Sequence, residues 1–211
     1  MGSNKMNQTN IVLLFKNHLW ENLARLYSSN DIVKILSFKE SLILAYQLLY
    51  NDSWDEDLQE YAIKLLYEIR NNHSQDWDKS WEYDALIGLA CDIRYKHEER
   101  YLAYKKAIEK CNDPPPRLLI EFARCCVCPG HPPITYDEAI ELTMKALRDA
   151  QYSDGISLLC NLYSLKNDEI NKEYWSKVLK NINDNGKKIN SPSMEPKFLV
   201  DEYLKNLKKL N

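Results

Sequence analysis

Two similar helical segments, separated by one other predicted helix, constrain the fold of this chain more than any other feature. The first segment runs from Glu99 to Pro116, where small and aromatic residues recur at helical spacing until three consecutive prolines end the pattern. A variant of this segment returns from Tyr136 to Asp149. A helix type that recurs after one intervening helix predicts a series of helix pairs.

The recurring segment resembles the second helix of a tetratricopeptide repeat. Tyr104 and Ala107 match the aromatic and alanine positions of that helix, and Gly88 then falls on the small residue of the helix before it. Further positions in register are Leu119, Phe122, Ala123, Cys126, Ala139, Thr143 and Ala146, and a weaker third unit begins at Asp154. The chain departs from the family pattern at Asp84, where a tryptophan is expected, and through four extra residues between the helices of the second unit.

The resemblance covers about residues 84–182 and implies antiparallel helix pairs stacked as a right-handed array, with a concave face for a peptide or protein. An amphipathic helix expected at 195–209 is then a C-terminal cap over the open end of that array. We therefore predict an all-α fold made of TPR-like stacked helix pairs and a capping helix.

The predicted domain organisation is one helical-repeat domain over residues 9–211, preceded by residues 1–8 as a disordered N-terminus or an expression remnant. Within the domain, the N-terminal helices occupy 9–75 and the TPR-like pairs 76–184. The apolar period predicts that the first helix runs from about Thr9 to Tyr27, with His18 packed on its buried side.

Composition excludes several classes of protein. Only five glycines are present, which disfavours an all-β fold, because its hairpins use glycine repeatedly. A net charge of −3 leaves no electrostatic footprint for nucleic acid. No segment reaches the roughly 20 apolar residues that a spanning helix needs. The six cysteines fall inside helical segments. We expect a cytoplasmic protein that contacts neither membrane nor nucleic acid.

The middle of the chain is acidic and rich in aromatic residues. From Glu40 to Arg100 it has 14 acidic and 6 basic side chains, a net charge of −8. Tryptophan dominates binding hot spots, and acidic groups attract a basic partner. The predicted partner-binding residues are Trp54, Asp55, Glu56, Asp57, Trp77, Asp78 and Trp81. Two structural interpretations compete: Ser53 and the acids after it also suit a helix start, and Trp77, Trp81 and Ala85 form a stripe that could pack into the core.

Cys125, Cys128 and His131 form the candidate for metal or redox chemistry. The Cys-x-x-Cys spacing suits zinc, but a structural site needs four ligands and no second pair follows at a suitable spacing. A redox pair is expected to open a helix, whereas this pair closes one. We expect packed or incidental cysteines, with no metal site and no cofactor, and keep a zinc- or redox-dependent protein as an alternative.

The chain carries no nucleotide-binding glycine loop, nucleophile elbow or zinc-protease motif. We predict a monomeric, non-enzymatic helical-repeat protein that binds another protein. Its most concrete form is an immunity or antitoxin protein that neutralises a cognate basic toxin domain, such as a nuclease. The alternative is a scaffold or chaperone adaptor that binds an extended peptide on the concave face.

Overall fold

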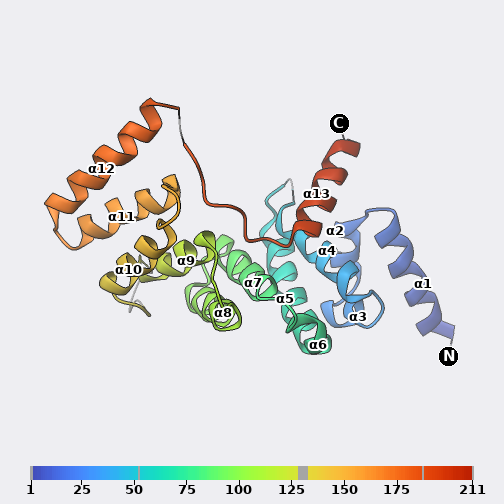
Figure 1. Cartoon of the computed structure of the whole chain (residues 1–211). Coiled ribbons are helices and arrows are strands. Elements are labelled where there is room, and N and C mark those ends of the chain that lie inside the picture. The colour runs from blue at the N-terminus through green and yellow to red at the C-terminus, as the bar shows by residue number, and fades with distance from the viewer. Residues whose placement is uncertain (1, 52, 128–132, 187, 211) are drawn as a thin grey trace. The chain divides into compact units, whose positions relative to one another are not determined.

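The computed structural model describes residues 2–51, 53–127, 133–186 and 188–210, and these ranges are predominantly helical (Figure 1). Their regular elements are thirteen α-helices and one short 3₁₀ helix, without a strand. The predicted all-α class is therefore confirmed. No helix within these ranges is long and apolar enough to cross a membrane.

The chain divides into two compact units, the first of which is discontinuous in sequence. The first unit holds Met1–Lys96 and Glu195–Asn211, and the second holds His97–Met194. The boundary after Lys96 falls inside the segment 76–184 that the sequence predicts as TPR-like pairs. The two helices of the first predicted pair therefore belong to different units.

The first unit is organised around the packing of α4 on α5. Its described helices are α1 (Gly2–Lys16), α2 (Trp20–Leu26), α3 (Ser29–Val33), α4 (Phe38–Leu49), α5 (Glu56–Asn72), α6 (Ser74–Trp77), α7 (Glu82–Ile93) and α13 (Lys197–Leu210). A capping box between Ser37 and Glu40 begins α4, since each side chain bonds the backbone of the other residue. Leucines of α4 and α5, among them Leu42, Leu49 and Leu65, are fully buried and form the core.

The first predicted helix is interrupted. The sequence predicts one helix over Thr9–Tyr27, but α1 ends at Lys16 and α2 begins at Trp20. His18 between them has a φ of +58°, a left-handed conformation that a continuous right-handed helix cannot contain. Its side chain is exposed and meets Trp20 edge-on at 5.0 Å between ring centroids, so the prediction that it packs in the core is wrong. At its other end, α1 begins within the segment 1–8 that is expected to be disordered.

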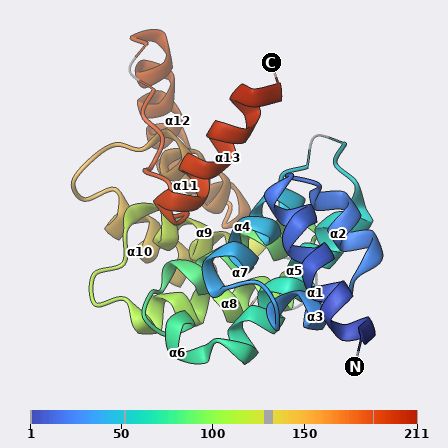
Figure 2. The same cartoon turned by 90° about the vertical axis from the view of Figure 1, so that its right-hand side faces the viewer.

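Helix α13 packs on α4, as both views of the chain show (Figures 1 and 2). Glu195, just before α13, accepts hydrogen bonds on Oε1 from the hydroxyls of Tyr46 at 2.7 Å and Tyr50 at 2.9 Å. The Tyr203 hydroxyl donates to the Tyr50 carbonyl oxygen at 3.1 Å. Helix α13 therefore completes the first unit, which corrects the prediction that it caps an array ending in the helix before it.

The second unit consists of neighbouring helices that pack in sequence order. Its described elements are α8 (His97–Lys110), α9 (Pro116–Ala123), the 3₁₀ helix η1 (Arg124–Val127), α10 (Tyr136–Ala146), α11 (Ser153–Leu165) and α12 (Glu169–Asp184). α9 packs on α10, α10 on α11, and α11 on α12. At Gly155 in α11, a Cβ atom would lie 2.9 Å from Leu147 Cδ2 and 3.2 Å from Ile120 Cδ1, so the glycine lets these elements approach closely.

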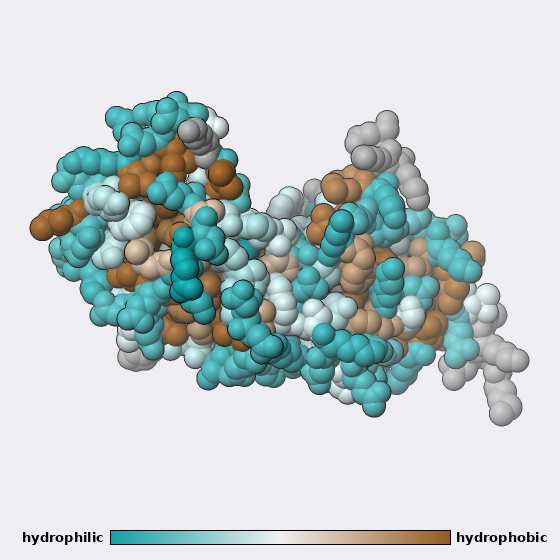
Figure 3. Space-filling model, in the orientation of Figure 1, coloured by the Kyte–Doolittle hydropathy of each residue, from teal (hydrophilic) through white to brown (hydrophobic). Residues whose placement is uncertain are grey.

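Small residues at the predicted repeat positions lie inside the second unit. Ala139 and Ala146 of α10 are buried, and the buried Thr143 donates from Oγ1 to the Ala139 carbonyl at 2.7 Å. The last helix of this unit, α12, is largely exposed. It has no buried residue, and its Ile170 is 83% exposed. Figure 3 shows apolar residues in brown at several places on the face in view. The structure thus shows packed neighbouring helices, and the TPR-like arrangement stays a prediction.

Asp154 ties the segment that follows α12 to α11. Its Oδ1 accepts the Ser191 backbone N–H at 3.1 Å, its Oδ2 accepts the Ser191 hydroxyl, and Arg117 Nη1 lies 3.0 Å from the same Oδ2. Burial raises the pKa of the Asp154 carboxyl, but the hydrogen bonds from Ser191 and the charge of Arg117 outweigh it and hold the pKa below its ordinary value. The ionised carboxylate therefore stabilises the folded state.

We expect Asp154→Asn to lower the free energy of unfolding by about 1–3 kcal/mol near pH 7, because it removes charge-assisted hydrogen bonds. The folded pKa lies below the unfolded value of about 3.9, so this contribution is present above about pH 4 and is lost as pH falls through the folded pKa. Urea unfolding followed by far-UV circular dichroism measures it, with the exposed Glu169→Gln as control. A difference between Asp154→Asn and wild type that persists unchanged at about pH 2 contradicts the assignment.

We expect Glu195→Leu to loosen α13, because two tyrosine hydroxyls lose their shared acceptor. Amide hydrogen exchange within α13 should become about tenfold faster, while exchange within the second unit stays unchanged. Glu195→Gln keeps an acceptor oxygen of the same shape and should have a smaller effect. Equal exchange in Glu195→Leu and wild type would show that the helix is held by other contacts.

Candidate functional site

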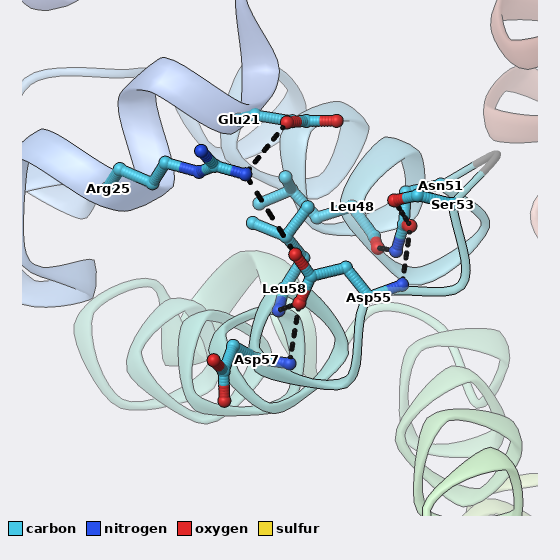
Figure 4. A network of polar contacts seen from close by, with 8 residues as sticks. All are labelled: Glu21, Arg25, Leu48, Asn51, Ser53, Asp55, Asp57 and Leu58. Atoms are coloured by element: carbon cyan, nitrogen blue, oxygen red, sulfur yellow. Dashed lines mark hydrogen bonds and ion pairs between the residues drawn. The ribbon is translucent and has the colours of Figure 1, made fainter.

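The turn between α4 and α5 presents residues 54–57, the first four of the predicted partner-binding residues. Figure 4 shows the polar contacts of this turn around Asn51 and Asp55. Asn51 organises this turn. Its Nδ2 donates to the Leu48 carbonyl at 2.7 Å, and its Oδ1 accepts from the Ser53 hydroxyl and from the Asp55 backbone N–H, both at 2.9 Å. One amide side chain therefore joins the end of α4 to the start of α5.

Asp55 is the N-cap of α5. Its Oδ1 accepts the backbone N–H groups of Asp57 at 2.9 Å and Leu58 at 3.3 Å, and its Oδ2 lies 3.9 Å from Arg25, which also pairs with Glu21 at 3.2 Å. The sequence suggests Ser53 as the cap, but the helix starts two residues later. Asp55 takes this role because its carboxylate accepts the free backbone N–H groups of the first turn. Asp55 therefore acts first as a structural residue.

Trp54 is the most distinctive residue of the turn. Its backbone has a φ of +51°, in the left-handed region, and its side chain is 63% exposed. The left-handed conformation costs an ordinary L-residue about 1–2 kcal/mol, and a residue that buries so little of its side chain regains little of that cost by packing. Strained backbone of this kind clusters at functional sites, which makes Trp54 a candidate, and Tyr95 has the same combination, with a φ of +54° and a side chain that is 79% exposed.

Basic side chains partly neutralise the acids beside Trp54. Glu56, whose side chain is 74% exposed, lies 2.6 Å from Arg94, and Glu60 lies 3.6 Å from Arg94 and 3.1 Å from Lys96. The hydrogen bond from Arg94 and its positive charge hold the pKa of Glu56 below its ordinary value. Asp57 is exposed and has no ion-pair partner among the residues that the structure describes.

The acidic character of the turn survives this pairing in reduced form. The charged groups just described are Glu21, Asp55, Glu56, Asp57 and Glu60, against Arg25, Arg94 and Lys96. Five negative and three positive groups give a local net charge of −2. This is a moderate negative charge beside an exposed indole, weaker than the sequence count of the whole acidic middle indicates.

The other predicted partner-binding residues lie at the far end of α5. The ion pair between Arg94 and Glu56 brings the end of α7 to the start of α5, so the start of α7 lies near the end of α5. With 17 residues, α5 is about 25 Å long. The residues 54–57 and 77–81 are therefore on opposite ends of this helix, and the structure does not bring the seven predicted residues together in one surface.

Trp77 is a core residue. It is fully buried, its Nε1 donates to Asp84 Oδ1 at 3.1 Å, and its ring packs against Tyr83 at 5.5 Å between centroids. The structure thus favours the core alternative for Trp77 and removes it from the predicted partner-binding surface, because a partner cannot reach it without local unfolding. Asp78 is exposed and Trp81 is partly exposed, so both could contact a partner at that end.

The cysteine cluster is only partly described. Cys125 is buried and its Sγ lies 3.7 Å from the Glu121 carbonyl oxygen, while Cys128 and His131 lie outside the described residues. Cys126 is buried in the core of the second unit. Within the described part of the chain, no three histidine, cysteine or carboxylate side chains gather in a way that could hold a metal ion.

The sequence does not reveal that basic side chains pair with the acids around Trp54. Arg25 comes from α2 and Arg94 follows α7, so both reach the acids of the turn through tertiary packing. An acid and a base three or four positions apart on one helix would be a local signal of pairing. The pairs Arg25–Asp55 and Arg94–Glu56 are separated by 30 and 38 positions, so no such signal exists for them.

The turn offers a test of its own geometry. We expect Asp55→Ala to lower the free energy of unfolding of the first unit by about 1 kcal/mol, because two backbone donors at the start of α5 lose their acceptor. Asp57→Asn, at an exposed position without an ion-pair partner in the described structure, is the matched control and should change it by less than about 0.5 kcal/mol. Urea unfolding followed by tryptophan fluorescence measures both, since four of the five tryptophans lie in the first unit. Equal effects would show that Asp55 does not cap the helix.

Comparison with known proteins gives no relative: no family model, no curated protein and no solved structure matches the chain.

Proposed function

We propose that this protein acts without chemistry of its own, by binding another protein through the exposed side chains of Trp54, Glu56 and Asp57, here called the Trp54 surface. The observation that carries the proposal is the indole of Trp54, 63% exposed on a left-handed backbone. The free protein already bears the cost of this conformation, so a partner that covers the indole gains its apolar burial without that cost.

Hydrogen bonds fix the backbone on both sides of Trp54. Asn51 bonds the chain on both sides of Trp54, through Leu48 and Asp55. Backbone that is already ordered loses little conformational entropy when a partner covers the turn, which raises affinity. An exposed tryptophan on such a backbone is a candidate hot-spot residue, and truncation of a hot-spot residue typically costs 2 kcal/mol or more of binding energy.

The acids define the kind of partner. The net charge of about −2 around the turn attracts a basic surface and speeds its association, most strongly at low salt. A cognate basic toxin domain, such as a nuclease, fits this description, and the protein then acts as an immunity protein or antitoxin. In this form it is a monomer that covers the toxin in a one-to-one complex.

A second candidate function rests on the second unit. Its neighbouring helices pack in order, and α12 leaves Ile170 and Tyr174 exposed at 83% and 58%. In a TPR-like array such a unit holds an extended peptide, which makes the protein a scaffold or chaperone adaptor. This candidate predicts that binding depends on the second unit and is indifferent to Trp54.

Substitution of Trp54 tests whether the Trp54 surface binds the partner. We expect Trp54→Gly to weaken partner binding by about 30-fold or more, since a hot-spot tryptophan is lost. The same change should leave the free energy of unfolding unchanged or raise it by up to about 1 kcal/mol, because glycine adopts a positive φ without strain. Stability measured by urea unfolding thus moves opposite to affinity.

The binding measurement begins by co-expressing the chain with the products of neighbouring genes and identifying by mass spectrometry what stays bound through a salt wash. Stopped-flow association with the captured protein then compares Asp57→Lys with Asp78→Lys, a reversal at the opposite end of α5. We expect Asp57→Lys to slow association by about tenfold and to reduce its salt dependence. Asp78→Lys should retain the wild-type rate.

Either of two results would contradict partner binding through the Trp54 surface. One is full binding by Trp54→Gly, and the other is an equal effect of the charge reversals at positions 57 and 78. Loss of binding only after substitutions in the second unit, for example Tyr174→Ala, would favour the peptide-binding adaptor.

A further inference from the structure

Tyr95, two positions after the end of α7, has a largely exposed aromatic side chain in the first unit. The side chain is 79% exposed, on a backbone with a φ of +54°. Among the residues that the structure describes, its ring has no aromatic contact and its hydroxyl has no hydrogen bond. Packing within the described structure therefore does not explain a large aromatic residue at this position.

The end of α7 explains the positive φ. The backbone N–H of Lys96 donates to the Cys91 carbonyl at 2.8 Å, and that of Tyr95 donates to the Asp92 carbonyl at 3.1 Å. These two hydrogen bonds form a Schellman motif, in which the residue in the place of Tyr95 adopts a left-handed conformation. That residue is usually glycine and sometimes asparagine. The motif therefore requires the conformation but does not require a tyrosine.

Other helices of the chain end with the usual residues. Asn167 stands two positions after the end of α11 with a φ of +57°, and Gly186 stands two positions after the end of α12 with a φ of +62°. Glycine and asparagine tolerate this conformation, whereas a bulky residue in it is an outlier. Glycine would thus suit the end of α7 better than Tyr95 does. What the tyrosine adds is an exposed ring.

Ion pairs join the end of α7 to the first turn of α5, next to the Trp54 surface. Arg94 lies 2.6 Å from Glu56, which belongs to that surface, and Lys96 lies 3.1 Å from Glu60. Tyr95 stands between the two basic residues in the chain. Its ring is therefore carried by a segment that is bonded on both sides to the helix that Trp54 precedes.

The pair between Arg94 and Glu56 also limits the distance between the two exposed rings. Extended side chains and a spacing of about 3.8 Å between successive Cα atoms put the Cα atoms of Trp54 and Tyr95 at most about 26 Å apart. A protein interface of standard size buries about 800 Å² on each partner, and a round patch of that area is roughly 32 Å across. One interface is therefore large enough to cover both residues.

The charge between the two residues is balanced. Glu56 and Glu60 pair with Arg94 and Lys96, so this strip carries no net charge. The net charge of −2 around the turn therefore comes from the other charged groups there, which include the exposed Asp57. A partner that covers both rings thus meets negative charge beside Trp54 and a paired, neutral strip before Tyr95.

We propose that Tyr95 is a second anchor of the Trp54 surface and that one basic protein covers both rings. This inference rests on the proposed function. The partner has a recess for the indole with lysine or arginine at its rim, and an uncharged recess for the phenol ring within about 26 Å of it. Because the charge around Tyr95 is balanced, this anchor slows dissociation of the complex and does not steer its formation.

Stopped-flow kinetics with the protein captured by co-expression test the second anchor. We expect Tyr95→Gly to speed dissociation about tenfold, with the wild-type association rate and salt dependence. Tyr95→Phe keeps the ring and should stay within about threefold of the wild-type dissociation rate. Asn167→Gly is the matched control, since it places glycine at the same kind of helix end without removing a ring, and it should retain both rates.

Urea unfolding of Tyr95→Gly separates a lost contact from a damaged fold. The variant should unfold at an equal or higher urea concentration than the wild type, because glycine adopts a positive φ without steric cost. A lower urea midpoint would contradict the second anchor, since it would show that the folded protein itself needs the ring.

The outcomes distinguish a failure of the second anchor from a failure of the proposed function. Wild-type dissociation of Tyr95→Gly, together with weakened binding by Trp54→Gly, overturns the anchor and leaves the Trp54 surface in place. Slower association of Tyr95→Gly with reduced salt dependence overturns the uncharged recess. Full binding by Trp54→Gly, or capture of no protein by the wild-type chain, contradicts the proposed function and the second anchor together.

Discussion

The hydrogen bonds of Asn51 and Asp55 fix the backbone of the turn between α4 and α5, where Trp54 lies. Asn51 closes the end of α4 and bonds the backbone of Asp55, and Asp55 caps the start of α5. A capped and bonded turn cannot relax, so Trp54 between the two residues is held in a left-handed conformation with its indole in solvent. The geometry of the Trp54 surface therefore depends on two short polar side chains.

Periodicity in the sequence predicts the class of fold well, because amphipathic helices leave a strong local signal. The alanines at 139 and 146 are buried as the predicted pairing of helices requires. Interruptions are harder to foresee: nothing local shows that His18 takes a positive φ and divides the first predicted helix. The partner of α13 is also beyond local reasoning, because Glu195 meets Tyr46 and Tyr50 across about 145 positions or more of sequence.

The predicted site shows the same division between local and tertiary information. Tryptophan among acids correctly marks an exposed residue at position 54, and the identical pattern at position 77 marks a buried one, since Asp84 satisfies that indole inside the core. Composition cannot separate the two. Nor does it show that one helix about 25 Å long places them at opposite ends, or that Arg25 and Arg94 offset part of the charge.

Amide hydrogen exchange of the complex with its captured partner tests the central claim most directly, because it reports on every segment at once. The account predicts that peptides covering residues 53–60 gain protection on binding, while those covering 76–82 and the helices of the second unit exchange as in the free protein. Protection confined to the second unit, with residues 53–60 unchanged, would contradict the Trp54 surface and support a peptide-binding helical array in its place.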